Sequence, residues 1–193
     1  MSVGERMKPV LIAMCGLMGT GKSTMAAELS ERTGFTLLRS DEVRKELAGL
    51  HKEEHRHEEF GEGMYGEAYF HATYSELFDR AASLLDEGSG VIIDASFKKE
   101  IYRAGAKEVA VRKGVPFLLI ECVCPDNEVK RRLQERERLG EDLSDGRWDI
   151  FQRQKSDFET VNKKMNEKEY LVIDTSEEGE LNIARILQLL EAL

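Results

Sequence analysis

The sequence predicts an α/β fold built on a mainly parallel sheet, and two observations support this class. Short apolar runs alternate with longer amphipathic segments along the chain, which is typical of parallel strands joined by helices. In addition, a glycine-rich octet at residues 16–23 lies between the first apolar run and the first amphipathic segment. Strand, glycine-rich loop and helix, in that order, form the context in which phosphate-binding loops occur.

Five short apolar runs predict the strands of this sheet. The clearest contains Val91, Ile92 and Ile93 in succession and carries no charge until Asp94. An uncharged run of this kind indicates a strand that is buried on both faces. The predicted strands cover residues 9–15, 35–39, 90–94, 115–122 and 169–174.

Apolar residues at i, i+3 and i+4 spacing predict the helices between these strands. In the longest such segment, Tyr74, Leu77, Phe78 and Ala81 follow this rhythm, and Gly88 can end the helix. The predicted helices cover residues 22–33, 41–48, 64–87, 98–113, 126–138, 146–164 and 180–192.

The chain has 193 residues, and we expect one domain over residues 1–193 with a substantial core. Its 28 basic and 37 acidic side chains give a formal net charge of −9. An acidic total lacks the general charge footprint of a protein that binds nucleic acid or an anionic membrane, although it permits a local basic groove. We expect neither a membrane span nor a signal peptide.

The three cysteines, Cys15, Cys122 and Cys124, lie in or beside apolar runs. The spacing of the last two fits neither a C-x-x-C redox motif nor a zinc site. We interpret all three as small buried residues in a reducing compartment, which predicts a cytoplasmic location.

The octet satisfies the pattern G-x-x-x-x-G-K-[ST] of a phosphate-binding P-loop. Gly16, Gly19 and Gly21 allow backbone turns that a Cβ would forbid, so that N–H groups can point at phosphate oxygens. Lys22 brings positive charge to the β- and γ-phosphates, and Ser23 offers a hydroxyl to Mg²⁺. A glycine-rich turn without a ligand fits this context less well. The predicted nucleotide-binding residues of the loop are Gly16, Leu17, Met18, Gly19, Thr20, Gly21, Lys22, Ser23 and Thr24.

Asp41 and Arg44 follow the second predicted strand, three residues apart on one helix face. In an α/β fold such a helix begins at the carboxyl edge of the sheet, where ligands bind. Asp41 can orient the proton of an attacking hydroxyl, and Arg44 can hold the acceptor or the moving phosphoryl group. An ordinary surface ion pair at a helix start is the alternative.

Asp94 ends the strand that begins at Val91, as the carboxylate of a Walker B strand does. At the carboxyl edge of the sheet it can join Ser23 in holding Mg²⁺ through water. Apolar strands that end in Asp are common, so this prediction depends on the P-loop nearby.

Four arginines crowd the segment from Arg131 to Arg138. Arg132 and Arg136 share a helix face, and phosphoryl transfer needs positive charge that a closing lid brings over the phosphates. We therefore predict a lid at about residues 132–147 and assign Arg131 and Arg138 to the surface. The alternative is a solvated helix in which neighbouring glutamates pair with these arginines.

Two further segments are candidates for contact with a ligand. Thr175 follows the last predicted strand and can frame the adenine, although a strand-to-helix turn there would be ordinary. Residues 49–63, with His51, His55 and His57, are interpreted as a mobile insertion with a solvated charged face rather than a metal site. The sequence leaves open whether this insertion contacts the substrate.

With these motifs in place, residues 9–176 resemble the small P-loop kinases of the AAA-family predicted-kinase type. They are also similar to the kinase domains of polynucleotide 5′-kinases and to zeta-toxin-like, gluconate and shikimate kinases. The resemblance implies a three-layer α/β/α P-loop NTPase fold with a five-stranded sheet and a helical lid. It further implies Mg-ATP as donor, Asp41 as general base and an arginine-bearing lid.

We therefore expect a kinase that moves the γ-phosphoryl group of Mg-ATP to a hydroxyl of a small molecule. One alternative is a polynucleotide 5′-hydroxyl kinase, and another is a nucleotide-dependent switch that hydrolyses ATP slowly. The sequence specifies neither the acceptor, nor ATP over GTP, nor the oligomeric state. The predicted catalytic residues are Lys22, Asp41, Arg44, Arg132 and Arg136.

Overall fold

The computed structural model describes residues 7–49, 67–138, 147–161, 166 and 168–193 of the chain. Within them, five strands form one sheet in which every neighbouring pair is parallel. The predicted five strands and their direction are therefore confirmed. The strands are β1 (Leu11–Cys15), β2 (Thr36–Arg39), β3 (Val91–Asp94), β4 (Phe117–Val123) and β5 (Tyr170–Asp174).

The strand order is β2-β3-β1-β4-β5, so β1 is the central strand. From β1 the chain runs through a helix to β2 on one side, and from β3 it crosses to β4 on the other side of β1. The order of the strands thus reverses at the carboxyl end of β1. In open parallel sheets, this switch point is where ligands bind.

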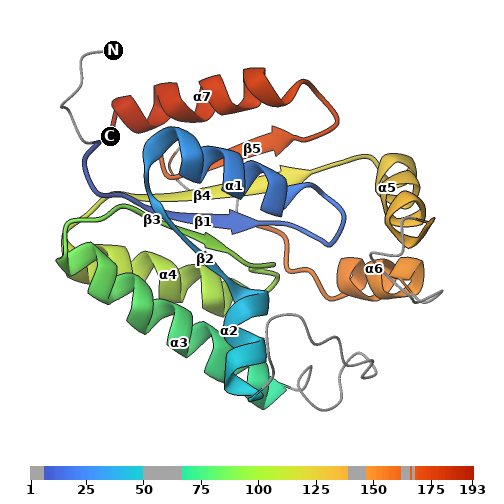
Figure 1. The fold of residues 1–193 in the computed structure, drawn as a ribbon, viewed down its shortest axis with the longest axis horizontal. Helices are drawn as coiled ribbons and strands as arrows, with labels where there is room; N and C mark the ends of the chain where they lie inside the picture. Colours follow the sequence, from blue (N-terminus) through green and yellow to red (C-terminus); the bar gives the residue numbers. More distant parts are fainter. Residues whose placement is uncertain (1–6, 50–66, 139–146, 162–165, 167) are drawn as a thin grey trace.

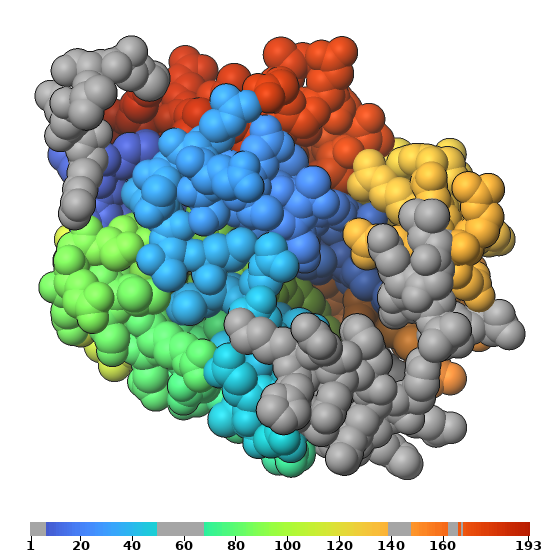
Figure 2. All heavy atoms as spheres, in the orientation of Figure 1, coloured from blue at the N-terminus to red at the C-terminus, as the bar shows by residue number. Residues whose placement is uncertain are grey.

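Alternate residues of β1 face two different cores. Leu11 and Ala13 pack with apolar residues of α3 (Glu67–Asp86) and α4 (Glu100–Lys113). Ile12 and Met14 pack with those of α1 (Lys22–Thr33) and α7 (Gly179–Glu191). Figure 1 shows the resulting three layers, and Figure 2 shows α7 (red) beside α1 (blue) on the viewed face. These four residues of β1 are completely buried, which explains why the run is apolar without interruption.

The remaining helices are α2 (Ser40–Leu47), α5 (Asp126–Arg138) and α6 (Arg147–Ser156). Figure 1 shows α5 and α6 together at one end of the sheet, beyond the arrowheads of β1 and β4. Most helix predictions agree with the structure to within two residues, and Gly88 takes the left-handed conformation expected at the end of α3, with φ of 79°. No helix among the described residues is long and apolar enough to cross a membrane.

One helix prediction was wrong. The segment 146–164 was expected to be helical throughout, but α6 ends at Ser156. Tertiary contacts outweigh local helix preference here: the N–H of Glu159 donates to the carbonyl of Lys98, and its carboxylate accepts from the N–H of Glu100 at 2.6 Å. Glu159 thus satisfies an N–H group in the first turn of α4, which a continued α6 would leave unpaired.

The cysteines differ in exposure. Cys15 and Cys122 lie in β1 and β4 and are buried, whereas Cys124, just beyond β4, is only partly covered. Burial raises the pKa of Cys15 and of Cys122 to about 12, so both thiols stay protonated at neutral pH. The interpretation as buried residues holds for two of the three.

We predict that iodoacetamide at pH 8 alkylates Cys124 in the folded protein well before Cys15 or Cys122. Alkylation requires both access and the thiolate, and the latter two side chains offer neither. Mass spectrometry of peptides after timed quenching measures the order, with urea-unfolded protein as the control in which all three react. Equal rates in the folded protein would contradict the assignment.

Candidate functional site

The P-loop leaves β1 at the switch point, and its glycines adopt the backbone that the motif predicts. Gly16, Gly19 and Gly21 have φ values of 137°, 73° and 80°. At Gly16 the constraint is twofold, because a Cβ would also lie 2.5 Å from the carbonyl oxygen of Cys122. The N–H of Gly16 donates to the carbonyl of Ser96, which ties the start of the loop to the segment after β3.

The carbonyl of Leu17 organises the interior of the loop. It accepts hydrogen bonds from Nζ of Lys22 at 2.6 Å and from Oγ1 of Thr20 at 2.7 Å. Burial lowers the pKa of Lys22, and the nearby carboxylate of Asp94 opposes that effect. The lysine head is therefore held inside the loop and within electrostatic reach of Asp94.

Ser23 and Thr24 lie exposed in the first turn of α1, directly after Gly21. The N–H groups of a first helical turn, together with the positive end of the helix dipole, form a ready anion site. Asp94, at the end of β3, is 7% exposed, and strand pairing places it beside Met14 of β1. One carboxylate and one hydroxyl at this edge fit Mg²⁺, which takes its other ligands from water and phosphate oxygens.

The segment after β3 is held by a buried cluster that the sequence did not reveal. Phe97 has a φ of 45°, unusual for a residue with a side chain. Its N–H donates to Oη of Tyr74 at 2.9 Å, and its carbonyl accepts from Nη1 of Arg103 at 2.8 Å and from Sγ of Cys15. This cluster fixes the segment on which Gly16 is anchored.

Arg103 of α4 belongs to this buried cluster and is not available to an exposed positive strip at the sheet edge. Its side chain is 5% exposed, and its guanidinium lies against the carbonyl of Phe97 and the ring of Phe158. Arg103 therefore supports a backbone turn from within the protein and adds no exposed positive surface.

Asp41 and Arg44 lie on one face of α2, as their spacing predicts. Nη2 of Arg44 donates to Oδ1 of Asp41 at 2.7 Å, and Nζ of Lys45 lies 3.7 Å from the other oxygen. Asp41 is 63% exposed and open to a ligand, whereas Arg44 is 13% exposed. Arg39, the last residue of β2, lies opposite Asp94 in the register of β2 with β3. The start of α2 therefore lies at the same sheet edge as the P-loop. Ser40 begins the helix rather than capping it.

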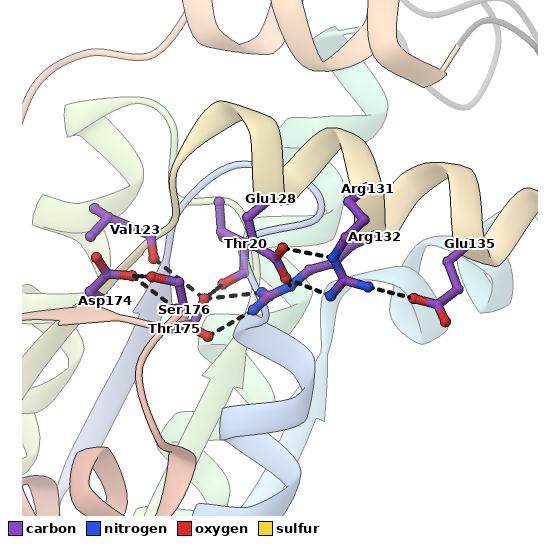
Figure 3. A network of polar contacts seen from close by, with 9 residues as sticks. All are labelled: Thr20, Val123, Glu128, Arg131, Arg132, Glu135, Asp174, Thr175 and Ser176. Carbon is purple, nitrogen blue, oxygen red and sulfur yellow. Dashed lines mark hydrogen bonds and ion pairs between the residues drawn. The ribbon is translucent and has the colours of Figure 1, made fainter.

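Arg132 connects α5 to the loop after β5, as Figure 3 shows. Its guanidinium donates to the carbonyl of Thr175 at 2.8 Å, to Oγ1 of Thr175 at 3.2 Å and to Glu128 at 2.8 Å. Hydrogen bonds from Arg131 and Arg132 lower the pKa of the Glu128 carboxyl to about 2. The hydroxyl of Thr175 in turn donates to the carbonyl of Thr20 in the P-loop at 2.8 Å.

The other three arginines of α5 are all exposed. Arg131 pairs with Glu128 and Glu135 on the surface, and Arg138 is exposed. Arg136 is also exposed, but its charge is among those that lower the pKa of Lys22, after the larger effect of burial. Contacts thus place Arg132 beside Thr175 and Gly21, whereas Arg136 is linked to the loop only by its electrostatic effect on Lys22.

The α5–α6 pair packs directly on the P-loop through a third apolar cluster. Val129, Leu133 and Phe151 form its buried part, and Leu17 and Met18 of the loop pack against them. A Cβ on Gly19 would lie 2.9 Å from the side chain of Val129, which shows how close this approach is. One polar contact accompanies it, in which the N–H of Met18 donates to Oε1 of Gln154 at 3.1 Å.

Several predicted features lie outside the described residues: most of the insertion 49–63, with its three histidines, and the lid residues 139–146. Among the residues that are described, no group of three or more His, Cys, Asp or Glu side chains could hold a metal ion. Sequence reasoning missed Tyr74, Phe97 and Gln154, because none of them belongs to a motif. Only the position of Phe97, just after the Walker B-like strand, offered a signal.

We predict that Thr175→Val lowers the free energy of unfolding by about 1–3 kcal/mol, because it leaves the buried carbonyl of Thr20 without its hydroxyl partner. Urea titration measures the change. Ser83→Ala is the control, since it removes a hydroxyl bonded to a backbone carbonyl on the exposed side of α3 and should cost less than about 0.5 kcal/mol. Equal effects would show that Thr175 does not tie the two loops together.

Known proteins share parts of this sequence and its fold. The sequence matches the family model described as an AAA domain over residues 11–161. An uncharacterised protein of Mycobacterium tuberculosis is 33% identical over 95 residues, which are 49% of this chain but only 19% of that much longer protein. A shikimate kinase of Paramagnetospirillum magneticum is 26% identical over 178 residues, 92% of this chain and 82% of that protein.

Solved structures resemble the whole described fold. A putative kinase from Chloroflexus aurantiacus has a TM-score of 0.70 at 17% identity, covering 94% of this chain and 98% of that one. A sugar kinase from Janibacter has a TM-score of 0.66 at 19% identity over 95% of both chains. The adenosine phosphosulfate (APS) kinase of M. tuberculosis, solved with AMPPNP and APS, has a TM-score of 0.64 at 21% identity, covering 95% and 98%.

Identities this low establish the fold alone, and that fold is the kinase-like P-loop NTPase fold that the resemblance implied. The family match extends from β1 through the P-loop, the Asp94 strand and both helices of the α5–α6 pair. The chain therefore belongs to the AAA domain family AAA_33.

Proposed function

We propose that the protein is an ATP-dependent phosphotransferase that moves the γ-phosphoryl group of Mg-ATP to a hydroxyl group of a small molecule. The observation that carries the proposal is the placement of Asp41 at the same sheet edge as the P-loop, exposed and paired with Arg44. A carboxylate that is exposed beside the P-loop is where the hydroxyl of an acceptor would approach the γ-phosphate.

Each part of the site has a role in this reaction. The N–H groups of the loop and Lys22 bind the phosphates. Ser23 and Asp94 would hold Mg²⁺, which would supply positive charge to the phosphate oxygens. Asp41 accepts the hydroxyl proton as the acceptor oxygen bonds to the γ-phosphorus and the bond to the β–γ bridging oxygen breaks, which leaves ADP. Arg44 orients Asp41 and holds the acceptor.

The two arginines of α5 supply positive charge to the transition state. Arg136, whose charge acts on Lys22, covers the phosphates during transfer. Arg132 acts from its fixed position beside Gly21, where it is bonded to Thr175, and Thr175 frames the adenine. Because Glu128 and Thr175 already fix Arg132, its guanidinium loses little freedom on binding.

A small acceptor is favoured over a polynucleotide end for two reasons. The net charge of −9 repels a polyanion, and the burial of Arg103 removes one of the cations that a phosphate-binding strip would have needed. The names of the similar proteins, a shikimate kinase and a sugar kinase among them, support small hydroxyl-bearing acceptors. We propose further that residues 1–193 act as one cytoplasmic kinase domain, with a lid that includes α5 and α6.

The test uses γ-labelled ATP and Mg²⁺ with a pooled extract of small metabolites in one tube and a 5′-hydroxyl oligonucleotide in another. We predict label on a small molecule, a loss of about 10²-fold or more with Asp41→Asn because proton transfer is removed, and no transfer with Lys22→Met. Thin-layer separation followed by mass spectrometry measures and identifies the product.

Matched controls distinguish chemistry from folding. Lys8→Met and Asp79→Asn make the same changes at exposed positions away from the site and should leave transfer unchanged. Label on the oligonucleotide would replace the small acceptor with a polynucleotide end. Release of phosphate alone, at the same rate in Asp41→Asn, would instead favour a nucleotide-dependent switch.

A further inference from the structure

Gln154 of α6 makes a polar contact with the P-loop beside the apolar cluster that joins α5 and α6 to it. Its Oε1 accepts the N–H of Met18 at 3.1 Å, and its side chain is partly covered. Among the described residues the structure records this partner for Oε1 and none for Nε2. Because a backbone N–H can only donate, the carbonyl end of the amide must face Met18, and the two N–H groups of Nε2 remain for another acceptor.

The position of Gln154 indicates which acceptor that is. Met18 is adjacent to Leu17, whose carbonyl holds Nζ of Lys22 at 2.6 Å. The lysine of a P-loop reaches the β- and γ-phosphates, so Gln154 lies at the terminal-phosphate end of the loop. Thr175 and Arg132 approach the loop at other residues, Thr20 and Gly21.

Gln154 is also held firmly enough to act as a fixed donor. The next residue, Lys155, bonds both carboxylate oxygens of Asp126 at the start of α5, at 2.8 and 2.6 Å. Phe151, one turn earlier, is 2% exposed and stacks on Trp148. A donor whose backbone is anchored on both sides needs little reordering to bind a ligand.

We propose that Gln154 binds the γ-phosphate of ATP through Nε2, with Oε1 held on Met18, and so distinguishes ATP from ADP. This inference rests on the proposed function, since it requires ATP in the P-loop. The α6 helix thereby places a neutral donor on the transferred group, while Lys22 and Arg136 supply charge. A hydrogen bond to a phosphate oxygen is charge-assisted and stronger than one between neutral groups.

A purely structural role is the competing explanation, in which Gln154 only fastens α6 to the loop. The two roles differ in nucleotide preference. A fastening residue affects ATP and ADP equally, whereas a γ-phosphate contact affects ATP alone.

The experiment measures binding of Mg-ADP and of the non-hydrolysable analogue β,γ-imido-ATP to the full chain by titration calorimetry. We predict that Gln154→Met weakens binding of the ATP analogue about tenfold or more, which is the usual contribution of a hydrogen bond to a charged group. It should weaken binding of ADP far less. Gln154→Glu keeps the acceptor for Met18 but loses the donors, and it should shift the ratio of the two affinities in the same direction.

Gln152→Glu is the matched control, because it adds the same charge on the same helix at an exposed position and should leave the ratio unchanged. Equal losses for both nucleotides in Gln154→Met and Gln154→Glu, or no loss, would overturn the inference while leaving the kinase proposal intact. If the wild-type protein binds neither nucleotide, the proposed function fails and the inference fails with it. Thermal melting of each variant without nucleotide verifies that it folds.

Discussion

The site depends on the pairing of β1 with a parallel strand on each side. β3 and β4 flank it, so Asp94 at the end of one neighbour and Cys122 near the end of the other both lie beside the P-loop. The first residue of the loop is held on both sides, because Gly16 approaches the carbonyl of Cys122 and donates to that of Ser96. Parallel pairing thus brings residues that are distant in sequence together at one edge of the sheet.

Three sets of contacts connect this sheet edge to the segments around it. The buried cluster around Phe97 holds the segment after β3, and Glu159 holds the start of α4 from the chain that leaves α6. Thr175 joins the loop after β5 to Thr20. The α5–α6 pair is therefore linked to the sheet edge both through its apolar contact with the P-loop and through the segment that follows α6.

The fold could be predicted almost completely from the sequence because its signals are local. The run at Val91 has no charge, and the octet requires a strand before it and a helix after it. The wrong boundary at Ser156 had a cause that no local pattern contains, namely the contacts of Glu159 with α4. In the same way, the motif residues of the site could be predicted from their spacing. Gln154 and Tyr74 could not, because their contacts join residues more than twenty positions apart in the chain.

The positive charge of Arg103 is buried behind the sheet edge, where salt cannot screen it. An arginine keeps its charge under all ordinary conditions, and this one is 5% exposed, directly behind the turn that follows Asp94. Mobile ions screen exposed charges such as that of Arg131, but they cannot surround a buried guanidinium. The attraction between Arg103 and the carbonyl of Phe97 therefore persists in concentrated salt, in which surface ion pairs such as those of Arg131 weaken.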